Sequence, residues 1–215
     1  EMMPQFSRGA RLSPDKLVGG LALLVLGLFK KVVIADGLSP AVAACFGPAD
    51  AGQAVDATLA WQGALAYTFQ LYFDFSGYTD MARGAAKLFG IDLPLNFDSP
   101  YKARNIAEFW RRWHMTLSRF LRDYLYIPLG GNRRGKARRY RNLMLTMLLG
   151  GLWHGAGWNF VIWGGLHGLY LVVQHGFEAL HRRLRAPQAR DTLGDSELAW
   201  IGRSVSTLVP FAVVV

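Results

Sequence analysis

The feature that most constrains this chain is a long apolar stretch, Leu143–Val173, with a histidine at its centre. A transmembrane helix needs roughly 20 apolar residues, so the stretch is long enough to lie in a bilayer. Its middle reads Leu-Trp-His-Gly-Ala-Gly-Trp over residues 152–158. An ionisable side chain at membrane depth is costly and by default marks a functional site. We therefore expect His154 to take part in chemistry. The alternative is a structural histidine hydrogen-bonded between packed helices.

Basic residues bound this stretch on both sides, which predicts how it enters the membrane. Residues 133–141 precede it and residues 181–190 follow it, and both are rich in arginine. Lys and Arg are retained on the cytoplasmic side, so a chain with two basic ends should enter the membrane and return. Leu143–Trp153 would rise only about 16 Å at 1.5 Å per residue. We predict a broken, re-entrant pair of helices that turns at residues 155–157 and holds His154 near mid-depth.

The overall composition also favours a membrane protein. Hydrophobic residues make up 52% of the 215, and the mean hydropathy is +0.16, which is ordinary for a polytopic membrane protein. The chain starts at Glu1 and stops inside the apolar run Val205–Val215, so we interpret it as a piece of a longer protein. Cys45 is the one cysteine, so neither a disulfide framework nor a cysteine metal cluster is indicated. No metal is expected.

Positive charge gathers between Tyr101 and Asn142, where twelve Lys and Arg residues face two acidic ones. Such a cluster can contact nucleic acid. Beside hydrophobic spans, cytoplasmic retention explains it better, so we expect no nucleic-acid partner. Attraction to anionic lipid headgroups or to an anionic acyl donor is a secondary role for the same charges. Within this region, residues 132–141 are expected to form a short basic loop.

Two further apolar segments precede the basic region. Leu17–Ala35 would span the membrane core if helical, with Lys30 and Lys31 either reaching an interface or facing a polar interior. Residues 36–56 contain Pro40, Gly47, Pro48 and Gly52, which predict a loop. Thr58–Phe75 is the second apolar segment, and a helix-like stretch follows it. A further apolar segment begins at Leu198.

Two aspartates flank Ser76–Gly77 at the end of the second apolar segment. Asp74 and Asp80 could serve as metal ligands or as a general acid/base pair. The Ser-Gly between them instead favours a helix break, with the carboxylates as helix caps or ion-pair partners. Arg83 and Lys87 are the available partners. We expect pairing or capping rather than catalysis.

An amphipathic helix is predicted over residues 106–121, which carry both aromatic and basic side chains. Glu108 can pair with Arg111 or Arg112 at helical spacing. Phe109, Trp113 and Phe120 make an apolar stripe along it. His114 lies on this aromatic helix, and the residues alone favour a structural role for it.

His167 follows His154 by thirteen residues, an offset of about 220° on one continuous helix, which is nearly the opposite face. The glycines between them make a continuous helix doubtful, so whether the two histidines meet stays open. The sequence contains no Walker, dinucleotide or Gly-x-Ser-x-Gly motif.

Acyl transfer is the chemistry most natural to a histidine in an apolar channel. Desolvation keeps such an imidazole neutral near pH 7. A neutral imidazole can take the proton of a hydroxyl that attacks a thioester carbonyl, and return it to the leaving thiolate. No serine or cysteine nucleophile is needed, and none is visibly presented.

Several long motifs, in this order, resemble the membrane-bound O-acyltransferase (MBOAT) family, in particular its branch of bacterial alginate O-acetyltransferase membrane subunits. They are Phe-Asp-Phe-Ser-Gly-Tyr (73–78), Glu-Phe-Trp-Arg-Arg-Trp-His (108–114), Arg-Asp-Tyr-Leu-Tyr-Ile-Pro-Leu-Gly-Gly-Asn (122–132), Trp-His-Gly-Ala (153–156) and Trp-Gly-Gly-Leu-His-Gly (163–168). The similarity covers roughly residues 70–176, without a departure at a motif position.

The resemblance implies an all-α, multi-pass protein of the bacterial inner membrane, a helical bundle with broken helices around a funnel. Residues 1–215 would be part of one such membrane domain. The family's invariant histidine falls on His154 and its second functional histidine on His114, which overturns the structural interpretation of His114. The other candidates for the substrate or donor path are Trp153, Arg111, Arg122, Asp123, Asn132 and His167.

The same resemblance implies an acetyl group that passes from a cytoplasmic donor, acetyl-CoA or another acyl thioester, with no bound cofactor. The partners implied are membrane lipid, a polysaccharide acceptor and a periplasmic acetyltransferase protein. Two rivals remain: the D-alanyl transfer protein of teichoic acid modification, which shares the histidine pair, and a non-enzymatic channel or transporter.

Overall fold

The computed structural model describes residues 3–7 and 12–185, which form helices and connecting turns without a strand. They divide into two compact units, one up to Asn96 and one from Phe97, and each is described by itself. The predicted all-α class is thereby confirmed. The apolar segment predicted from Leu198 onward lies outside the described residues.

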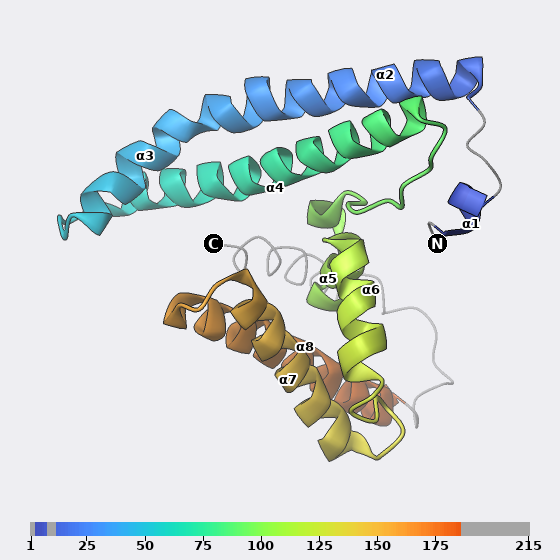
Figure 1. Cartoon of the computed structure of the whole chain (residues 1–215). Helices are drawn as coiled ribbons and strands as arrows, with labels where there is room; N and C mark the ends of the chain where they lie inside the picture. Colours follow the sequence, from blue (N-terminus) through green and yellow to red (C-terminus); the bar gives the residue numbers. More distant parts are fainter. Residues whose placement is uncertain (1–2, 8–11, 186–215) are drawn as a thin grey trace, which may run out of the picture. The chain divides into compact units, whose positions relative to one another are not determined.

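The first unit is a long helical hairpin (Figure 1). Its first arm is continuous over Pro14–Asp50 and consists of α2 (Pro14–Leu28), the π-helical η1 (Phe29–Ala35) and α3 (Asp36–Asp50). Its second arm is α4 (Ala57–Leu88), and a short α1 (Met3–Ser7) precedes the hairpin. Ser13 caps α2 by accepting a hydrogen bond from Lys16 N at 3.3 Å, and Asp56 caps α4 through Leu59 N at 2.9 Å.

The first arm fits a membrane span by length and composition. Pro14–Asp50 has 37 residues and an apolar window of mean hydropathy 2.2, and it is the one helix within residues 3–7 and 12–185 that meets this criterion. The predicted apolar helix at Leu17–Ala35 is present as α2 and η1.

Two predictions about this unit are wrong. Residues 36–50 are helical rather than a loop, with Pro40 and Pro48 inside α3. Proline removes one backbone hydrogen bond and disfavours a helix without forbidding it. The break expected at Ser76–Gly77 is also absent, because α4 runs through both residues.

Close helix packing explains the glycine at position 77. A Cβ on Gly77 would lie 2.7 Å from Gly27 O, and a Cβ on Gly27 would lie 2.5 Å from Gly77 O. Gly20 and Gly84 oppose each other in the same way, one heptad along each helix. Small residues let two backbones approach closely, as they do at membrane helix interfaces. The glycine therefore joins the two arms and does not break one of them.

Carboxylates pair with the two adjacent lysines in the middle of the first arm. Lys30 Nζ lies 2.6 Å from Asp80 Oδ2, and Arg83 Nη1 lies 3.4 Å from the other oxygen of the same carboxylate. Lys31 Nζ pairs with Asp74 at 2.7 Å and Asp36 at 2.8 Å. The aspartates thus act as ion-pair partners, as predicted, with Arg83 as a partner of Asp80. Lys87 instead pairs with Asp92 at 3.5 Å.

Replacing Asp80 should destabilise the hairpin far more than replacing Asp74. The Asp80 side chain is 12% exposed and that of Asp74 is 51% exposed. Breaking a buried ion pair from one side costs about 3–5 kcal/mol because it leaves a buried charge uncompensated, whereas an exposed pair contributes little. We expect Asp80→Asn to lower the thermal midpoint of the full-length protein in detergent clearly, with Asp74→Asn as the matched control. Equal losses would contradict this assignment.

The second unit begins with short helices. It contains η2 (Pro100–Lys102), α5 (Ile106–Arg112), α6 (Met115–Leu121) and the π-helical η3 (Arg122–Tyr126). The single helix predicted over residues 106–121 is therefore wrong, because Trp113 is extended and His114 adopts a left-handed conformation. The predicted apolar stripe is also not continuous. Phe109 and Trp113 are buried and stack with ring centroids 5.5 Å apart, but Phe120 is exposed.

The second half of this unit is a hairpin of two longer helices, α7 (Lys136–His154) and α8 (Trp158–Arg185), that pack side by side (Figure 1). The chain turns at residues 155–157, which confirms the predicted broken pair. Gly151 and Gly164 meet at the crossing, where a Cβ on Gly151 would lie 2.2 Å from Phe160 O. The predicted basic loop is shorter than expected, because α7 already starts at Lys136.

Candidate active site

One cavity of about 240 Å³ in the second unit contains both histidines proposed for the chemistry. Helices α5, α6 and α7 line most of it, with contributions from η3 and α8. Its wall includes His114, His154, Arg111 and Arg122. Most of the remaining lining is apolar or aromatic: Ala107, Trp110, Trp113, Leu117, Leu121, Tyr126, Leu143, Met147, Gly150, Trp163 and Leu171, with Ser118 and Thr146 as hydroxyl groups. The fold thus brings together two imidazoles that are 40 residues apart in sequence.

His154 is the last residue of α7, where the chain leaves the helix for the turn at residues 155–157. Its side chain is exposed. Aromatic rings surround it, with centroids 5.0 Å away at Trp153 and 5.3 Å away at Trp163, both edge-on. Phe160 stacks at 6.4 Å. The imidazole therefore has apolar neighbours on its flanks and an accessible side toward the cavity.

His114 occupies the break between α5 and α6, with a φ of 43°. A non-glycine residue in this left-handed region costs of order 1–3 kcal/mol, and such residues cluster at active sites. Its ring lies 6.4 Å from Phe97 and 6.2 Å from Trp153. Burial, and after it the nearness of His154, lowers the pKa of His114 to about 4. This imidazole is consequently neutral at physiological pH and can accept a proton.

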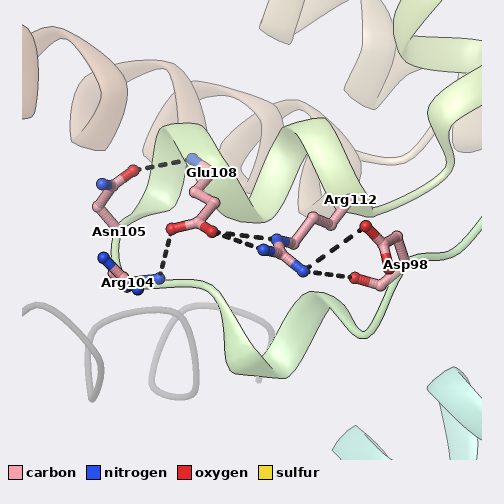
Figure 2. A network of polar contacts seen from close by, with 5 residues as sticks. All are labelled: Asp98, Arg104, Asn105, Glu108 and Arg112. Carbon is pink, nitrogen blue, oxygen red and sulfur yellow. Dashed lines mark hydrogen bonds and ion pairs between the residues drawn. The ribbon is translucent and has the colours of Figure 1, made fainter.

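A polar network holds the loop of residues 98–105 against α5 (Figure 2). Arg112 Nη2 donates to Glu108 Oε1 at 2.8 Å, and Arg112 Nη1 donates to the Asp98 carbonyl at 3.1 Å. Glu108 Oε2 accepts from Arg104 N at 2.9 Å, while Asn105 caps α5 by accepting from Glu108 N. These bonds, first that from Arg104 and then that from Arg112, hold the pKa of Glu108 below its usual range. The predicted pairing of Glu108 with an arginine is confirmed for Arg112.

The other predicted path residues are distributed around the cavity. Arg111 and Arg122 line it, whereas Asp123 and Asn132 are not part of the wall. Asp123 forms an exposed ion pair with Arg122 at 2.7 Å. Asn132 accepts a hydrogen bond from the hydroxyl of Tyr126, itself a wall residue. Both therefore sit one contact away from the cavity.

The remaining two predicted path residues, Trp153 and His167, differ in burial. Trp153 is 61% exposed and its ring touches both His114 and His154. His167 is buried, with ring centroids 5.0 Å from Trp110 and 4.5 Å from Trp163. Since Trp163 also contacts His154, its indole ring lies between the two histidines. His154 and His167 therefore contact the same indole ring.

Sequence reasoning missed three polar residues near the cavity. Ser118 and Thr146 line it, and Asn142 is fully buried. Asn142 Nδ2 donates to the carbonyls of Leu129 and Gly131 at 3.1 and 3.3 Å, which fastens the turn before α7 to that helix. A polar residue inside an apolar run is the signal that could have identified Thr146, whereas Asn142 stands between the basic residues and that run, where the sequence gives no comparable signal.

Comparisons with known proteins show the same relationship as the motifs. The sequence profile of the membrane-bound O-acyltransferase family matches residues 2–204. The peptidoglycan O-acetyltransferase of Helicobacter pylori is 50% identical over 208 residues, which are 94% of this chain and 39% of that protein. The probable alginate O-acetylase AlgI of Azotobacter vinelandii is 50% identical over 187 residues, 87% of this chain and 35% of that protein. The teichoic acid D-alanyltransferase of Streptococcus thermophilus is 40% identical over 114 residues, half of this chain and 28% of that protein.

The all-helical hairpins, the histidine cavity and these matches define the class of the protein. The chain belongs to the membrane-bound O-acyltransferase family, as its motifs predicted. It spans well under half the length of the curated relatives that it matches.

Proposed function

We propose that this chain forms the histidine-bearing part of a membrane O-acyltransferase. The enzyme passes an acetyl group from a cytoplasmic thioester donor, acetyl-CoA or another acyl thioester, across the bacterial inner membrane for O-acetylation of an exopolysaccharide such as alginate. The observation that carries this proposal is the single cavity lined by His114 and His154. Family membership and the names of the relatives support it.

The proposed reaction requires one base and no covalent enzyme intermediate. His154 accepts the proton of the acceptor hydroxyl as its oxygen attacks the thioester carbonyl. The tetrahedral intermediate then collapses, the carbon–sulfur bond breaks, and the departing thiolate takes the proton from His154. An ester and a free thiol result. His114, neutral because of its low pKa, lies at the same cavity and serves the acyl path or the proton transfer.

Cationic side chains at the cavity suit an anionic donor. Arg111 and Arg122 both line the wall, and guanidinium groups bind phosphate and carboxylate oxygens well. The basic turn before α7, which contains Arg133 and Arg134, suits anionic lipid headgroups at the cytoplasmic face. No nucleic-acid role is proposed for these charges.

A multi-pass arrangement completes the proposal. The span candidate Pro14–Asp50 supports a membrane location, and the α7–α8 hairpin would form the re-entrant pair that lines the funnel. Trp153, Asp123, Asn132 and His167 are proposed to shape the substrate path. A periplasmic acetyltransferase protein is the proposed partner for transfer to the polymer.

The acceptor has two candidates. A relative named for peptidoglycan acetylation is 50% identical to this chain over 208 residues, and relatives named for alginate acetylation are 50% identical over 187 residues and 54% over 160, so both polymers are candidate acceptors. D-alanyl transfer is a weaker candidate, because that relative matches half of the chain at 40% identity.

The test is the acetyl content of exopolysaccharide and of peptidoglycan in a knockout strain complemented with the full-length protein. We expect His154→Ala and His114→Ala each to abolish acetylation at an unchanged membrane level of protein, because the cavity then lacks a base or an acyl-path residue. His181→Ala, an exposed histidine near the end of α8, is the matched control and should keep wild-type acetylation.

The outcomes separate the rival functions. Wild-type acetylation in both cavity variants would overturn the proposed mechanism and favour a channel or transporter. Loss of D-alanine from teichoic acid instead of acetyl groups from the polymer would establish D-alanyl transfer as the function.

A further inference from the structure

The break between α5 and α6 is built from strained backbone. Within the part of the chain that the structure describes, Ser99 and His114 are the non-glycine residues with positive φ, at 46° and 43°. Ser99 directly follows Asp98, and His114 follows Arg112 by two residues. Strained conformations persist only where the surroundings over-determine them. Something must therefore hold both positions in place.

Asp98 and Arg112 are joined by backbone as well as side-chain contacts. Asp98 N donates to the Arg112 carbonyl at 3.0 Å, and Arg112 Nη1 donates back to the Asp98 carbonyl at 3.1 Å. The Asp98 carboxylate lies 3.6 Å from the same guanidinium (Figure 2). The carbonyl of Arg112, the last residue of α5, therefore accepts its hydrogen bond from the loop and not from a further helical turn. The helix accordingly ends two residues before His114.

Glu108 orients the guanidinium for this contact. It accepts from Arg112 Nε and Nη2 at 3.1 and 2.8 Å and is itself tied to the loop through Arg104 N. A guanidinium presents several donors in a rigid fork and can serve both partners at once, which an ammonium cannot.

Residues next to Asp98 and Arg112 also hold the break between α5 and α6 in place. Phe97, next to Asp98, is buried and packs edge-on against Trp113 at 5.0 Å. Ser118 Oγ on α6 lies 3.3 Å from the carbonyls of Trp110 and Trp113, to which it can donate. His114 follows Trp113 directly, so the position of its imidazole at the cavity depends on where α5 ends.

We infer that Arg112, held between Glu108 and Asp98, is a positioning residue that sets the place of His114 in the acyl-transfer cavity. The inference rests on the proposed function only for its catalytic consequence. Arg112 is not part of the cavity wall, so it acts through His114 and not on the substrate.

The decisive variant reverses the pair, Glu108→Arg with Arg112→Glu, in the full-length protein. The intrahelical ion pair is retained, but both bonds to the loop are lost because a glutamate cannot donate to the Asp98 carbonyl and an arginine cannot accept from Arg104 N. We expect a lower thermal midpoint, because the new glutamate faces the Asp98 carboxylate, with a near-wild-type KM and a kcat lowered about 10- to 100-fold, since a 1 Å misplacement can cost as much. Wild-type kcat in the reversed pair would overturn the inference.

A second variant keeps the test decisive if the reversed pair does not insert. Arg112→Lys preserves the charge and should lower kcat at unchanged KM, whereas Arg138→Lys, an exposed position on α7 outside the cavity, should not. Unchanged kcat in Arg112→Lys would also contradict the inference.

A chemical readout separates this inference from the proposed function. A cysteine introduced by His114→Cys is labelled with a thiol reagent, and its modification rate reports its position without any acetyl transfer. The rate should change when Arg112→Lys is added and stay constant with Arg138→Lys. If His114→Ala retains acetylation while labelling still depends on Arg112, the proposed role of His114 fails but its positioning stands. Equal labelling rates in both backgrounds would overturn the positioning.

Discussion

Purified full-length protein carrying His154→Ala is expected to transfer acetyl groups about 10²–10⁴-fold more slowly than the wild type, the range contributed by general acid–base catalysis. Free imidazole added to this variant should restore part of the rate. The reason is geometric: His154 is exposed at the end of α7 and lines a cavity of about 240 Å³, so truncation opens accessible space beside the substrate. The measurement is the initial rate with labelled donor at increasing imidazole concentration.

Two further variants define what the rescue means. His154→Gln keeps a polar side chain of similar size without a base and should be as slow as His154→Ala but resistant to rescue. His175→Ala, on α8 outside the cavity, should keep the wild-type rate. Full activity of His154→Gln would show that the residue acts by packing or hydrogen bonding, and the general-base assignment would be wrong.

Gly151→Ala should push α7 and α8 apart and destabilise the cavity that they line. The added Cβ would lie 2.2 Å from the Phe160 carbonyl and 3.2 Å from Gly164 Cα and N. All three are backbone atoms, so neither helix can relieve the contact by rotating a side chain. Overpacking of this kind typically costs about 1–3 kcal/mol. We expect a lower thermal midpoint in detergent, and a lower rate because His154 and the wall residue Trp163 lie on the two separated helices.

Gly165→Ala is the matched control for this prediction. It lies next to Gly164 on α8, and its Cβ would meet Leu148 Cδ2 at 3.5 Å, an ordinary contact with a flexible side chain. The helix propensity at position 165 should improve, since alanine is favoured over glycine within helices. If both variants were equally stable, the close approach of α7 and α8 at Gly151 would be disproved.

Local sequence patterns predicted the elements that depend on neighbouring residues. The turn at residues 155–157 follows from its glycines and from the short apolar run on each side, and the structure confirms it. His154 could be selected because an ionisable residue within an apolar stretch is exceptional. Helical spacing limited the partner of Glu108 to Arg111 or Arg112, and the structure shows Arg112.

Other positions are decided by partners that are distant in sequence. Pro40 and Pro48 predicted a loop, yet α3 stays helical while it packs along α4. Ser76–Gly77 predicted a break, but its glycine serves the contact with Gly27, 50 residues earlier. The helix break at His114 depends on a bond from Asp98, which no periodicity within residues 106–121 reveals.

The sequence by itself determined the all-helical class and the family, and it selected His154 as a candidate, because apolar run length, charge placement and motif order are properties of the linear chain. Only the tertiary structure decided that His114 and His154 share one cavity, that Lys30 and Lys31 are paired with Asp80 and Asp74, and that Arg112 joins α5 to the loop at Asp98. The physical reason is that hydrogen bonds, ion pairs and close backbone contacts depend on distances of 2–4 Å, which are set only when separated segments pack together.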